Sequence, residues 1–395
     1  MLFHFDFANY FQMVRLAWHE KNPRARRTYL AKLLLWVPPV ALFHAVCFLL
    51  DGILFPGLHR TAIRTPVFVV GHARSGTTLV HRLMSQDGER FSSLRLYEMF
   101  FPSLLQKELI RALGRLDRRW LGGWIERRVR AYDERTYGPS RHMHPTGIFE
   151  TEEDDQVLFY SMAAGFWITK MPYMGDLDFY YVDRWPERRQ RRMMRFYADC
   201  IRRQLYLNGR DRIHLSKNPV FPGRLETLLE TFPDARIVIP MRNPYETIPS
   251  LLELMRSGWK ALGWDPERQQ RCLRILADQS FDTYLYPLAV LARHPEVPHA
   301  VIDYRDLVAD PAATIEQIYR SLGLQVSPEY REVLLAEGKR ARHHKSGHSY
   351  SLEKFGLDAG AIRSGLAELF ERYGWEDASG SSARSEAEPS EVQTG

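Results

Sequence analysis

Gly71-His-Ala-Arg-Ser-Gly-Thr-Thr78 is the stretch that decides the fold of this chain. The apolar run 66–70 before it is typical of a buried strand in a parallel sheet, and residues 78–86 after it place their apolar side chains on one helical face. A glycine-rich loop between a strand and a helix presents backbone N–H groups and the helix N-terminus to a bound anion. The sequence therefore predicts a phosphate-binding loop.

The position of the positive charge distinguishes this loop from that of a P-loop kinase or NTPase. Gly71 and Gly76 have the P-loop spacing, but Thr77 stands where a lysine should follow the second glycine. The cation lies inside the loop instead, as Arg74. A kinase or NTPase needs that lysine to reach the β- and γ-phosphates, so this class is only an alternative.

The rest of the chain continues the alternation of strands and helices. Three further strands are expected at 212–216, 236–241 and 299–304. Helical patterns are expected at about 103–135, 187–208, 222–232, 244–256 and 267–293. This order predicts an α/β fold in which a P-loop-like parallel sheet is flanked by helices. The expected units are an N-terminal hydrophobic helical segment (1–65), one large domain (66–378) and a disordered polar tail (379–395).

A second phosphate-binding element follows the strand 236–241. That strand runs into Arg242, where an NTPase would need the aspartate of its Walker B strand. A helix then begins with Asn243 as its N-cap and Pro244 at its first position. Ser250 follows Arg242 by eight residues. A guanidinium pairs with phosphate through two N–H groups, and a hydroxyl donates one further hydrogen bond.

These two elements resemble the sulfotransferases that use 3′-phosphoadenosine 5′-phosphosulfate (PAPS). Their 5′-phosphosulfate loop has the form basic residue-Ser-Gly-Thr-Thr, and arginine as the basic residue is similar to the bacterial and tyrosylprotein branches. Their 3′-phosphate is held by an arginine at a strand end and a serine in the next helix. The resemblance covers about residues 66–356 and implies a PAPS-dependent sulfotransferase domain. The donor-binding residues that it implies are Arg74, Ser75, Gly76, Thr77, Thr78, Arg242 and Ser250.

Three further segments are similar to motifs of the family. Leu215-Ser-Lys217-Asn-Pro219 resembles the Asn-Lys-Asp-Pro segment of tyrosylprotein sulfotransferases, whose lysine stabilises the transferring group. Tyr304 opens Tyr-Arg-Asp-Leu-Val-Ala-Asp-Pro311, and the resemblance places it near the adenine. Lys345-Ser-Gly-His-Ser-Tyr350 is a basic loop of the kind that closes over the nucleotide.

Sulfuryl transfer is an in-line displacement in which negative charge builds on the leaving 5′-phosphate. Arg74 and Lys217 are therefore expected to be the catalytic cations. The leaving group is a stable phosphate, so no metal is required. The histidines are not paired with cysteines or carboxylates at ligand spacing, which also argues against a metal site.

The acceptor hydroxyl needs a general base. Glu98 lies roughly where the tyrosylprotein branch has its catalytic glutamate, and its neighbours are apolar, so it is the first candidate. The run Thr151-Glu-Glu-Asp-Asp155 also fits a helix start with Thr151 as N-cap. The other candidates for the base are Glu152, Glu153, His142 and His144.

The acceptor class stays open among lipid, sterol, phenol, carbohydrate and peptide tyrosine. The aromatic residues of 157–185 either line an acceptor pocket or form core. The net charge of +6 suits an anionic ligand, but the basic residues are too dispersed to predict nucleic-acid binding. Three widely spaced cysteines indicate a reducing compartment rather than a disulfide framework.

The N-terminal segment predicts membrane association. Residues 33–50 carry no charge and follow an arginine-rich stretch, but Pro38 and Pro39 interrupt them. We expect the chain to bend there, dip into one leaflet and return, so that the catalytic domain stays cytoplasmic. The alternatives for this segment are a full membrane span and a kinked helical hairpin packed on the domain. For the function of the chain, a membrane-tethered nucleotide-binding scaffold without activity is a further alternative.

Overall fold

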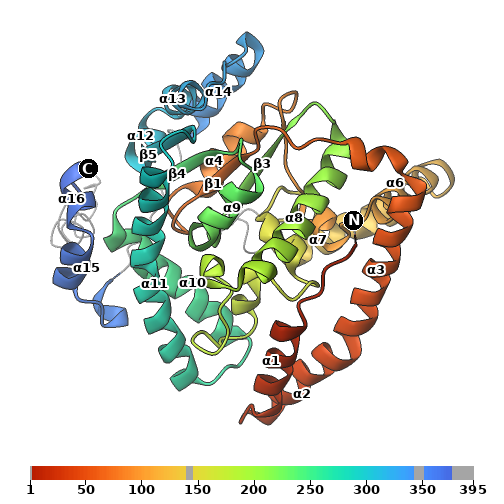
Figure 1. Cartoon of the computed structure of the whole chain (residues 1–395), viewed down its shortest axis with the longest axis horizontal. Helices are drawn as coiled ribbons and strands as arrows, with labels where there is room; N and C mark the ends of the chain where they lie inside the picture. Colours follow the sequence, from red (N-terminus) through yellow and green to blue (C-terminus); the bar gives the residue numbers. More distant parts are fainter. Residues whose placement is uncertain (1, 139–145, 342–350, 376–395) are drawn as a thin grey trace, which may run out of the picture.

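The computed structural model describes residues 2–138, 146–341 and 351–375, and its centre is a five-stranded parallel sheet (Figure 1). The strands run in the order β2-β3-β1-β4-β5. Their bounds are β1 Val67–Val70, β2 Phe91–Ser92, β3 Ile213–Asn218, β4 Arg236–Met241 and β5 His299–Asp303. The predicted parallel α/β sheet is confirmed. The short edge strand β2 was not expected, because its strand pattern is only two residues long.

The position of β1 in the sheet explains where ligands can bind. The chain goes from β1 to β2 and β3 on one side and then to β4 and β5 on the other. Open parallel sheets bind ligands outside the carboxyl ends of their strands, at the point where the strand order reverses. The predicted phosphate loop follows β1, and Arg242 follows β4 next to it. The sheet therefore brings the two predicted phosphate elements together.

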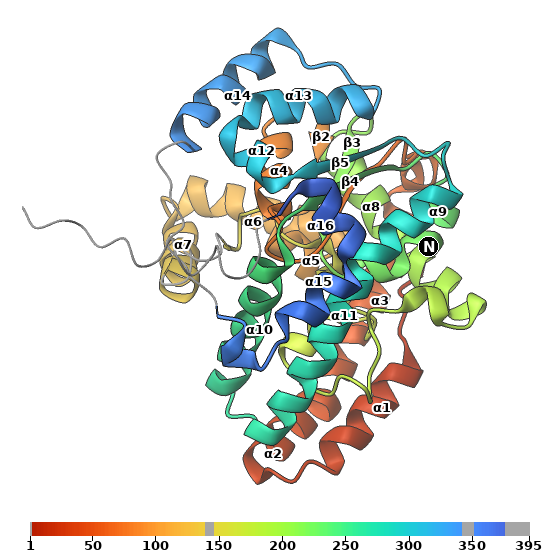
Figure 2. The same cartoon turned by 90° about the vertical axis from the view of Figure 1, so that its left-hand side faces the viewer.

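Helices cover both faces of the sheet (Figures 1 and 2). One core cluster joins α4, α13 and α14 to the sheet, and a larger one joins it to α8, α9, α10 and α11. The bounds on the first side are α4 Thr77–Ser85, α12 Tyr304–Ala309, α13 Pro311–Ser321 and α14 Pro328–Ala341. Those on the second side are α8 Glu187–Asn208, α9 Leu225–Thr231, α10 Pro244–Ala261 and α11 Pro266–Arg293. The C-terminal helices are α15 Ala359–Gly365 and α16 Ala367–Tyr373.

The arginine-rich region expected to be helical at 103–135 is two helices. They are α6 Leu104–Trp120 and α7 Trp124–Tyr137, and the short helix α5 Leu96–Phe100 precedes them. The break falls at Gly122 and Gly123, whose φ angles are 58° and 79°. Side chains are disfavoured in this left-handed region, so the two glycines allow the chain to turn.

The N-terminal segment forms α1 Phe7–Trp18, α2 Pro23–Ala31 and α3 Val37–Leu54, with a π-helical turn Lys32–Trp36 between the last two. α2, the π-helical turn and α3 make one uninterrupted helix, Pro23–Leu54. Among the described residues it is the one helix long and apolar enough to cross a membrane. The expected return of the chain at Pro38 and Pro39 is wrong. Both prolines lie within this continuous helix, directly after the π-helical turn, so the chain does not turn back at them.

The inner side of α3 is fastened to the domain by buried polar groups. Asp51 and Arg203 form a fully buried ion pair, with Oδ2 2.7 Å from Nε. The same carboxylate accepts from the Oγ of Ser103 and from the backbone N–H groups of Leu104 and Leu105, so it caps α6. Side chains of α1 to α3 belong to the larger core cluster. Segment 1–65 therefore packs on the domain as one helical layer. The expected disordered tail 379–395 lies outside the described residues.

Candidate active site

The phosphate-binding loop runs from the end of β1 to the start of α4. Arg74 and Gly76 both have positive φ angles, 72° and 99°, so the chain turns sharply here. A Cβ atom at Gly76 would lie 2.7 Å from the ring of Tyr304, so the position requires glycine. Ser75 is fully buried, and its Oγ has no hydrogen-bond partner among the described residues. A buried, unpaired hydroxyl beside a helix N-terminus is suited to an anionic ligand.

The second phosphate element reaches this loop from β4. Nη1 of Arg242 donates to the carbonyl oxygen of Arg74 at 3.2 Å. Nε of Arg74 donates to Oγ of Ser250, on α10, at 3.0 Å. The guanidinium of Arg242 also lies over the ring of Tyr304, 4.3 Å from its centroid. The structure therefore brings Arg74, Arg242, Ser250 and Tyr304 into one cluster at the carboxyl ends of the strands.

The start of α10 explains how Ser250 reaches the loop. Oδ1 of Asn243 accepts from the N–H of Tyr245 at 2.9 Å, which confirms the predicted N-cap. Because the helix begins directly after Arg242, its second turn is held close to the loop. Arg242 is also paired with the carboxylate of Glu246, with Nε 2.9 Å from Oε2. A phosphate bound here would compete with Glu246 for this guanidinium.

Lys217 enters the site from β3, where it lies beside Val69 of β1. Its side chain is 1% exposed, and its Nζ lies 3.4 Å from Oγ1 of Thr78 in the first turn of α4. The same Nζ lies 3.6 Å from Oε1 of Glu153 and 3.9 Å from Oε2 of Glu152. Lys217 therefore connects the phosphate loop to two carboxylates from another part of the chain. Strand β3 is longer than predicted and includes this lysine.

The surroundings of Glu152 change the pKa of its carboxyl group. Its backbone N–H donates to the carbonyl oxygen of Leu94 at 3.3 Å, next to an isolated β-bridge between Arg95 and Thr151. The possible helix start with Thr151 as N-cap is therefore wrong, because Thr151 lies in this bridge. Burial raises the pKa of Glu152 to about 7; Lys217 opposes this shift and Glu153 reinforces it. A carboxyl group with a pKa near neutrality is able both to accept and to release a proton.

Glu98, the first candidate for the base, lies apart from this cluster. Its Oε2 accepts from the N–H of Arg95 at 3.0 Å, which caps α5. Its Oε1 accepts from Nδ2 of Asn208, at the end of α8, at 3.2 Å. Neither partner belongs to the phosphate loop or to the surroundings of Lys217. The structure therefore does not bring Glu98 together with the predicted catalytic cations.

Asp154 and Asp155 were not among the predicted site residues, yet they position the segment that carries Glu152. Asp155 is buried and pairs with Arg224 at 3.0 Å. Asp154 contacts three side chains on or beside β3: Tyr197 at 2.6 Å, His214 at 3.0 Å and Ser216 at 2.9 Å. These contacts hold the segment against β3, next to Lys217. The four consecutive acidic residues were the available signal, but a helix start explained them equally well.

Three of the predicted or possible site residues, Lys345, His142 and His144, lie outside the described residues. Within the described part of the chain, no group of three His, Cys, Asp or Glu side chains could hold a metal ion. His72, in the loop, is buried, and burial lowers its pKa to about 4. Its Nε2 lies 3.0 Å from Oγ of Ser280, so the structure accounts for it as a neutral core residue.

The aromatic stretch 157–185 contributes both to the core and to a cavity. Trp167 and Tyr173 are buried in the larger core cluster. A cavity of about 180 Å³ lies beside them, lined by residues of 165–181, by Val220, which follows β3, and by two residues of α11. Its lining is mainly apolar and aromatic, and includes Ile168, Leu177, Phe179 and Tyr180.

The chain is similar to known sulfotransferases in sequence and in fold. A family model described as "Sulfotransferase family" matches residues 66–328. The chain is 27% identical over 329 residues to omega-hydroxy-beta-dihydromenaquinone-9 sulfotransferase Stf3 of Mycobacterium bovis and of Mycobacterium tuberculosis, covering 79% of this chain and 75% of each relative.

Two solved structures share the fold. Sulfotransferase STF9 from Mycobacterium avium has a TM-score of 0.72 at 18% identity, over 95% of this chain and 94% of that one. Sulfotransferase STF1 from Mycobacterium tuberculosis H37Rv has a TM-score of 0.63 at 21% identity, over 93% of this chain and 94% of that one. In both cases the likeness extends beyond the central sheet to nearly the whole chain.

Proposed function

Because this chain belongs to the sulfotransferase family, we propose that it transfers a sulfuryl group from PAPS to the hydroxyl of a membrane lipid, with Glu152 as the general base. The observation that carries this proposal is the position of Lys217. Its Nζ lies 3.4 Å from Thr78 of the phosphate loop and 3.9 Å from Glu152. The buried ammonium group of Lys217 therefore lies next to the loop that would bind the leaving phosphate and next to Glu152, whose pKa suits a base.

The residues at the carboxyl ends of the strands fit a donor with two phosphate groups. The loop, the N-terminus of α4 and the buried hydroxyl of Ser75 suit the 5′-phosphosulfate. Arg242 and Ser250 suit the 3′-phosphate, because both lie at the edge of the same loop. Tyr304 offers an aromatic ring beside them. Lys345 remains a predicted donor contact outside the described residues.

The donor supplies a sulfuryl group whose bond to the 5′-phosphate oxygen breaks as a bond to the acceptor oxygen forms. Arg74 and Lys217 stabilise the negative charge that develops on the leaving phosphate. Glu152 takes the proton of the acceptor hydroxyl. Burial keeps its pKa near 7, so a large fraction of the carboxylate is ionised at neutral pH and it is still basic enough to accept a proton. Glu98 was the earlier candidate, but its side chain caps α5.

A lipid acceptor is the class that the molecule supports best. The relative from Mycobacterium tuberculosis is named for a hydroxylated menaquinone, which is a lipid. The outer side of α3 exposes Leu42, Val46, Leu49 and Ile53, at helical spacing. The arginines of α2 lie at one end of this helix, where they can meet lipid phosphates. Since α3 is fastened to the domain along its inner side, we infer that it lies in one leaflet and leaves the catalytic domain on the cytoplasmic side.

Thermal unfolding with nucleotides tests the donor, and labelled PAPS tests the reaction. Adenosine 3′,5′-bisphosphate should raise Tm without Mg²⁺, whereas ATP with Mg²⁺ should not. Stabilisation by ATP with Mg²⁺ alone would favour the alternative kinase or NTPase. Transfer of label from PAPS to a hydroxylated isoprenoid lipid, but not to sugars or tyrosine peptides, is expected. Nucleotide binding without transfer to any acceptor class would favour a scaffold.

A further inference from the structure

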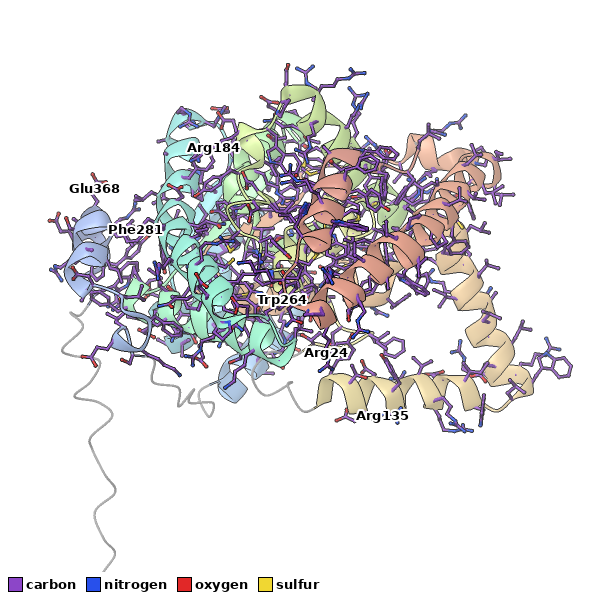
Figure 3. All side chains as sticks on the ribbon, turned by 90° about the horizontal axis from the view of Figure 1, so that it is seen from below. Arg24, Arg135, Arg184, Trp264, Phe281 and Glu368 are labelled. Atoms are coloured by element: carbon purple, nitrogen blue, oxygen red, sulfur yellow. The ribbon has the colours of Figure 1, made fainter. Side chains whose placement is uncertain are left out.

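The hairpin formed by α6 and α7 has almost no core of its own. Between residues 108 and 137 the buried residues are Asp117, Gly123 and Asp133, and no apolar side chain is among them. Figure 3 shows α7, marked by Arg135, running apart from the body, to which α6 connects it. Large apolar side chains are exposed along the hairpin: Leu109, Leu113, Leu116, Trp120, Leu121 and Trp124.

Four of these side chains form a continuous stripe on α6. Leu109, Leu113, Leu116 and Trp120 are separated by four, three and four residues, which places them on one side of a helix. Trp120 is 72% exposed and Leu113 59%. An amphipathic helix normally buries such a stripe, because exposed apolar area is unfavourable in water. The stripe therefore indicates a partner that covers it.

Polar groups, rather than packing, fix the shape of the hairpin. The carboxylate of Asp117 accepts from the backbone N–H groups of Ile125 and Glu126, both at 2.9 Å, so the end of α6 caps the start of α7. Glu126 pairs with Arg118 and Arg130. The hairpin is thus preformed, and the carboxylates of Asp117 and Glu126 are engaged within it.

Other arginines of the hairpin are not paired with carboxylates. Among the residues that the structure describes, Arg115, Arg119 and Arg128 form no ion pair. The guanidinium of Arg119 lies 5.4 Å from the ring of Trp120, and that of Arg128 lies 4.9 Å from the ring of Trp124. A helix that lies in a membrane interface typically has apolar side chains on one side, arginines beside them and tryptophans at its end. The hairpin has all three features.

We propose that the α6–α7 hairpin is an interfacial membrane anchor that inserts its leucine and tryptophan side chains among anionic lipids. A protein partner would cover the same apolar stripe, but the arginines without a carboxylate partner favour phosphate headgroups. The hairpin also begins beside α3, which exposes apolar side chains of its own. It begins where Asp51 of α3 caps α6, and Ile53, two residues further along α3, is 67% exposed.

The chain described from residue 146 onward contacts the hairpin and leads to the proposed catalytic base, a consequence that rests on the proposed function. The N–H of Ile148 donates to Oδ1 of Asp133 at 2.7 Å, after which the chain runs back alongside residues 94–97. Glu152 is the last residue of this return. Docking of the hairpin therefore brings the bilayer close to the segment that carries the base, where a lipid hydroxyl would arrive.

Vesicle binding by the full-length chain tests the proposal without a donor or an acceptor. The triple variant Leu113→Gln, Leu116→Gln, Trp120→Gln should bind vesicles of phosphatidylcholine and phosphatidylglycerol about tenfold or more weakly than the unchanged protein. Leu335→Gln is the matched control, because Leu335 is 53% exposed on α14, and it should bind normally. Unchanged binding by the triple variant would overturn the proposal, whatever the enzyme's activity proves to be.

A second measurement keeps the leucine and tryptophan side chains of the stripe, so a destabilised fold cannot explain its result. An environment-sensitive fluorophore on Leu121→Cys should become brighter and shift to the blue when vesicles are added, whereas the same label on Leu335→Cys should not. If neither label responds, the hairpin stays in water and the proposal is wrong. If the Leu121 label responds to protein concentration in the absence of lipid, the stripe binds a second copy of the chain, which also overturns the proposal.

Discussion

Replacing Glu152 by glutamine tests the proposed base through its pH dependence. Burial raises the pKa of Glu152 from an ordinary value of 4.5 to about 7. If Glu152 must be ionised to take the acceptor proton, kcat/KM of the unchanged enzyme should rise with pH and level off above about 7. At pH 6 about one molecule in ten holds the ionised form, so kcat/KM should be about a tenth of its plateau. Glu152→Gln should lose this dependence and lower kcat by about 10²–10⁴-fold.

Substitutions of the neighbours of Glu152 should move the pH at which kcat/KM rises, each in a predictable direction. Glu153→Gln removes a negative charge that raises the pKa of Glu152, so the rise in kcat/KM should move to lower pH. Lys217→Met removes the cation that lowers this pKa, so the rise should move to higher pH, together with a loss of kcat. Opposite or absent shifts would show that the titrating group is not beside these residues.

The same pKa predicts a stability effect that needs no substrate. A carboxyl group with a raised pKa in the folded state contributes its stability in full below pH 4.5, and that contribution is lost as the pH rises to about 7. The shift corresponds to about 3 kcal/mol. Relative to the unchanged protein, the free energy of unfolding of Glu152→Gln should therefore increase by about that amount across this window, measured by urea unfolding.

Two outcomes would refute the assignment. A Glu152→Gln variant with an unchanged pH profile would show that another group titrates. If instead Glu98→Gln abolishes the acidic limb while retaining affinity for adenosine 3′,5′-bisphosphate, the base is Glu98, and its capping of α5 must be rearranged in the reacting complex.

Three further predictions follow from the contacts around the site. Arg242→Ala and Ser250→Ala should each weaken binding of adenosine 3′,5′-bisphosphate by about 2–5 kcal/mol while leaving 5′-AMP nearly unchanged, by calorimetry; equal losses for both nucleotides would reject the 3′-phosphate role. Lys217→Ala should lower kcat more than donor affinity in single-turnover kinetics, because the charge that it stabilises grows in the transition state. Arg203→Met should destabilise the fold by about 3–5 kcal/mol in urea unfolding, because it leaves the buried carboxylate of Asp51 without its ionic partner. An unchanged midpoint of urea unfolding would mean that the ion pair does not contribute to stability.

The cluster around the phosphate-binding loop could be predicted from the sequence because its determinants are local. Strand, loop and helix follow one another within a few residues at Arg74, and again at Arg242. Backbone geometry then dictates where the side chains go. Gly76 and the N-cap Asn243 are required by the turn and by the helix start themselves, and the structure has both as expected.

The acceptor side depended on contacts between distant segments. Glu98 and Glu152 were both candidates for the base, and the sequence alone favoured Glu98 because of its place in the chain and its apolar neighbours. An isolated β-bridge pairs Arg95 with Thr151. Glu98, just after Arg95, caps α5, whereas Glu152, just after Thr151, lies near Lys217. Only after this pairing is Glu152 buried, and burial is what raises its pKa.

The exposed apolar surfaces of α3 and α6 show the same division. The apolar character of residues 33–50 and the arginine-rich helical pattern of 103–135 can be recognised in the sequence alone. The sequence did not determine which side chains the domain covers, because that depends on polar contacts such as those of Asp51 with Arg203 and α6. Local propensity decides which segments become strands, loops and helices, whereas burial, pKa and exposure are properties of the packed chain and appear only with the tertiary structure.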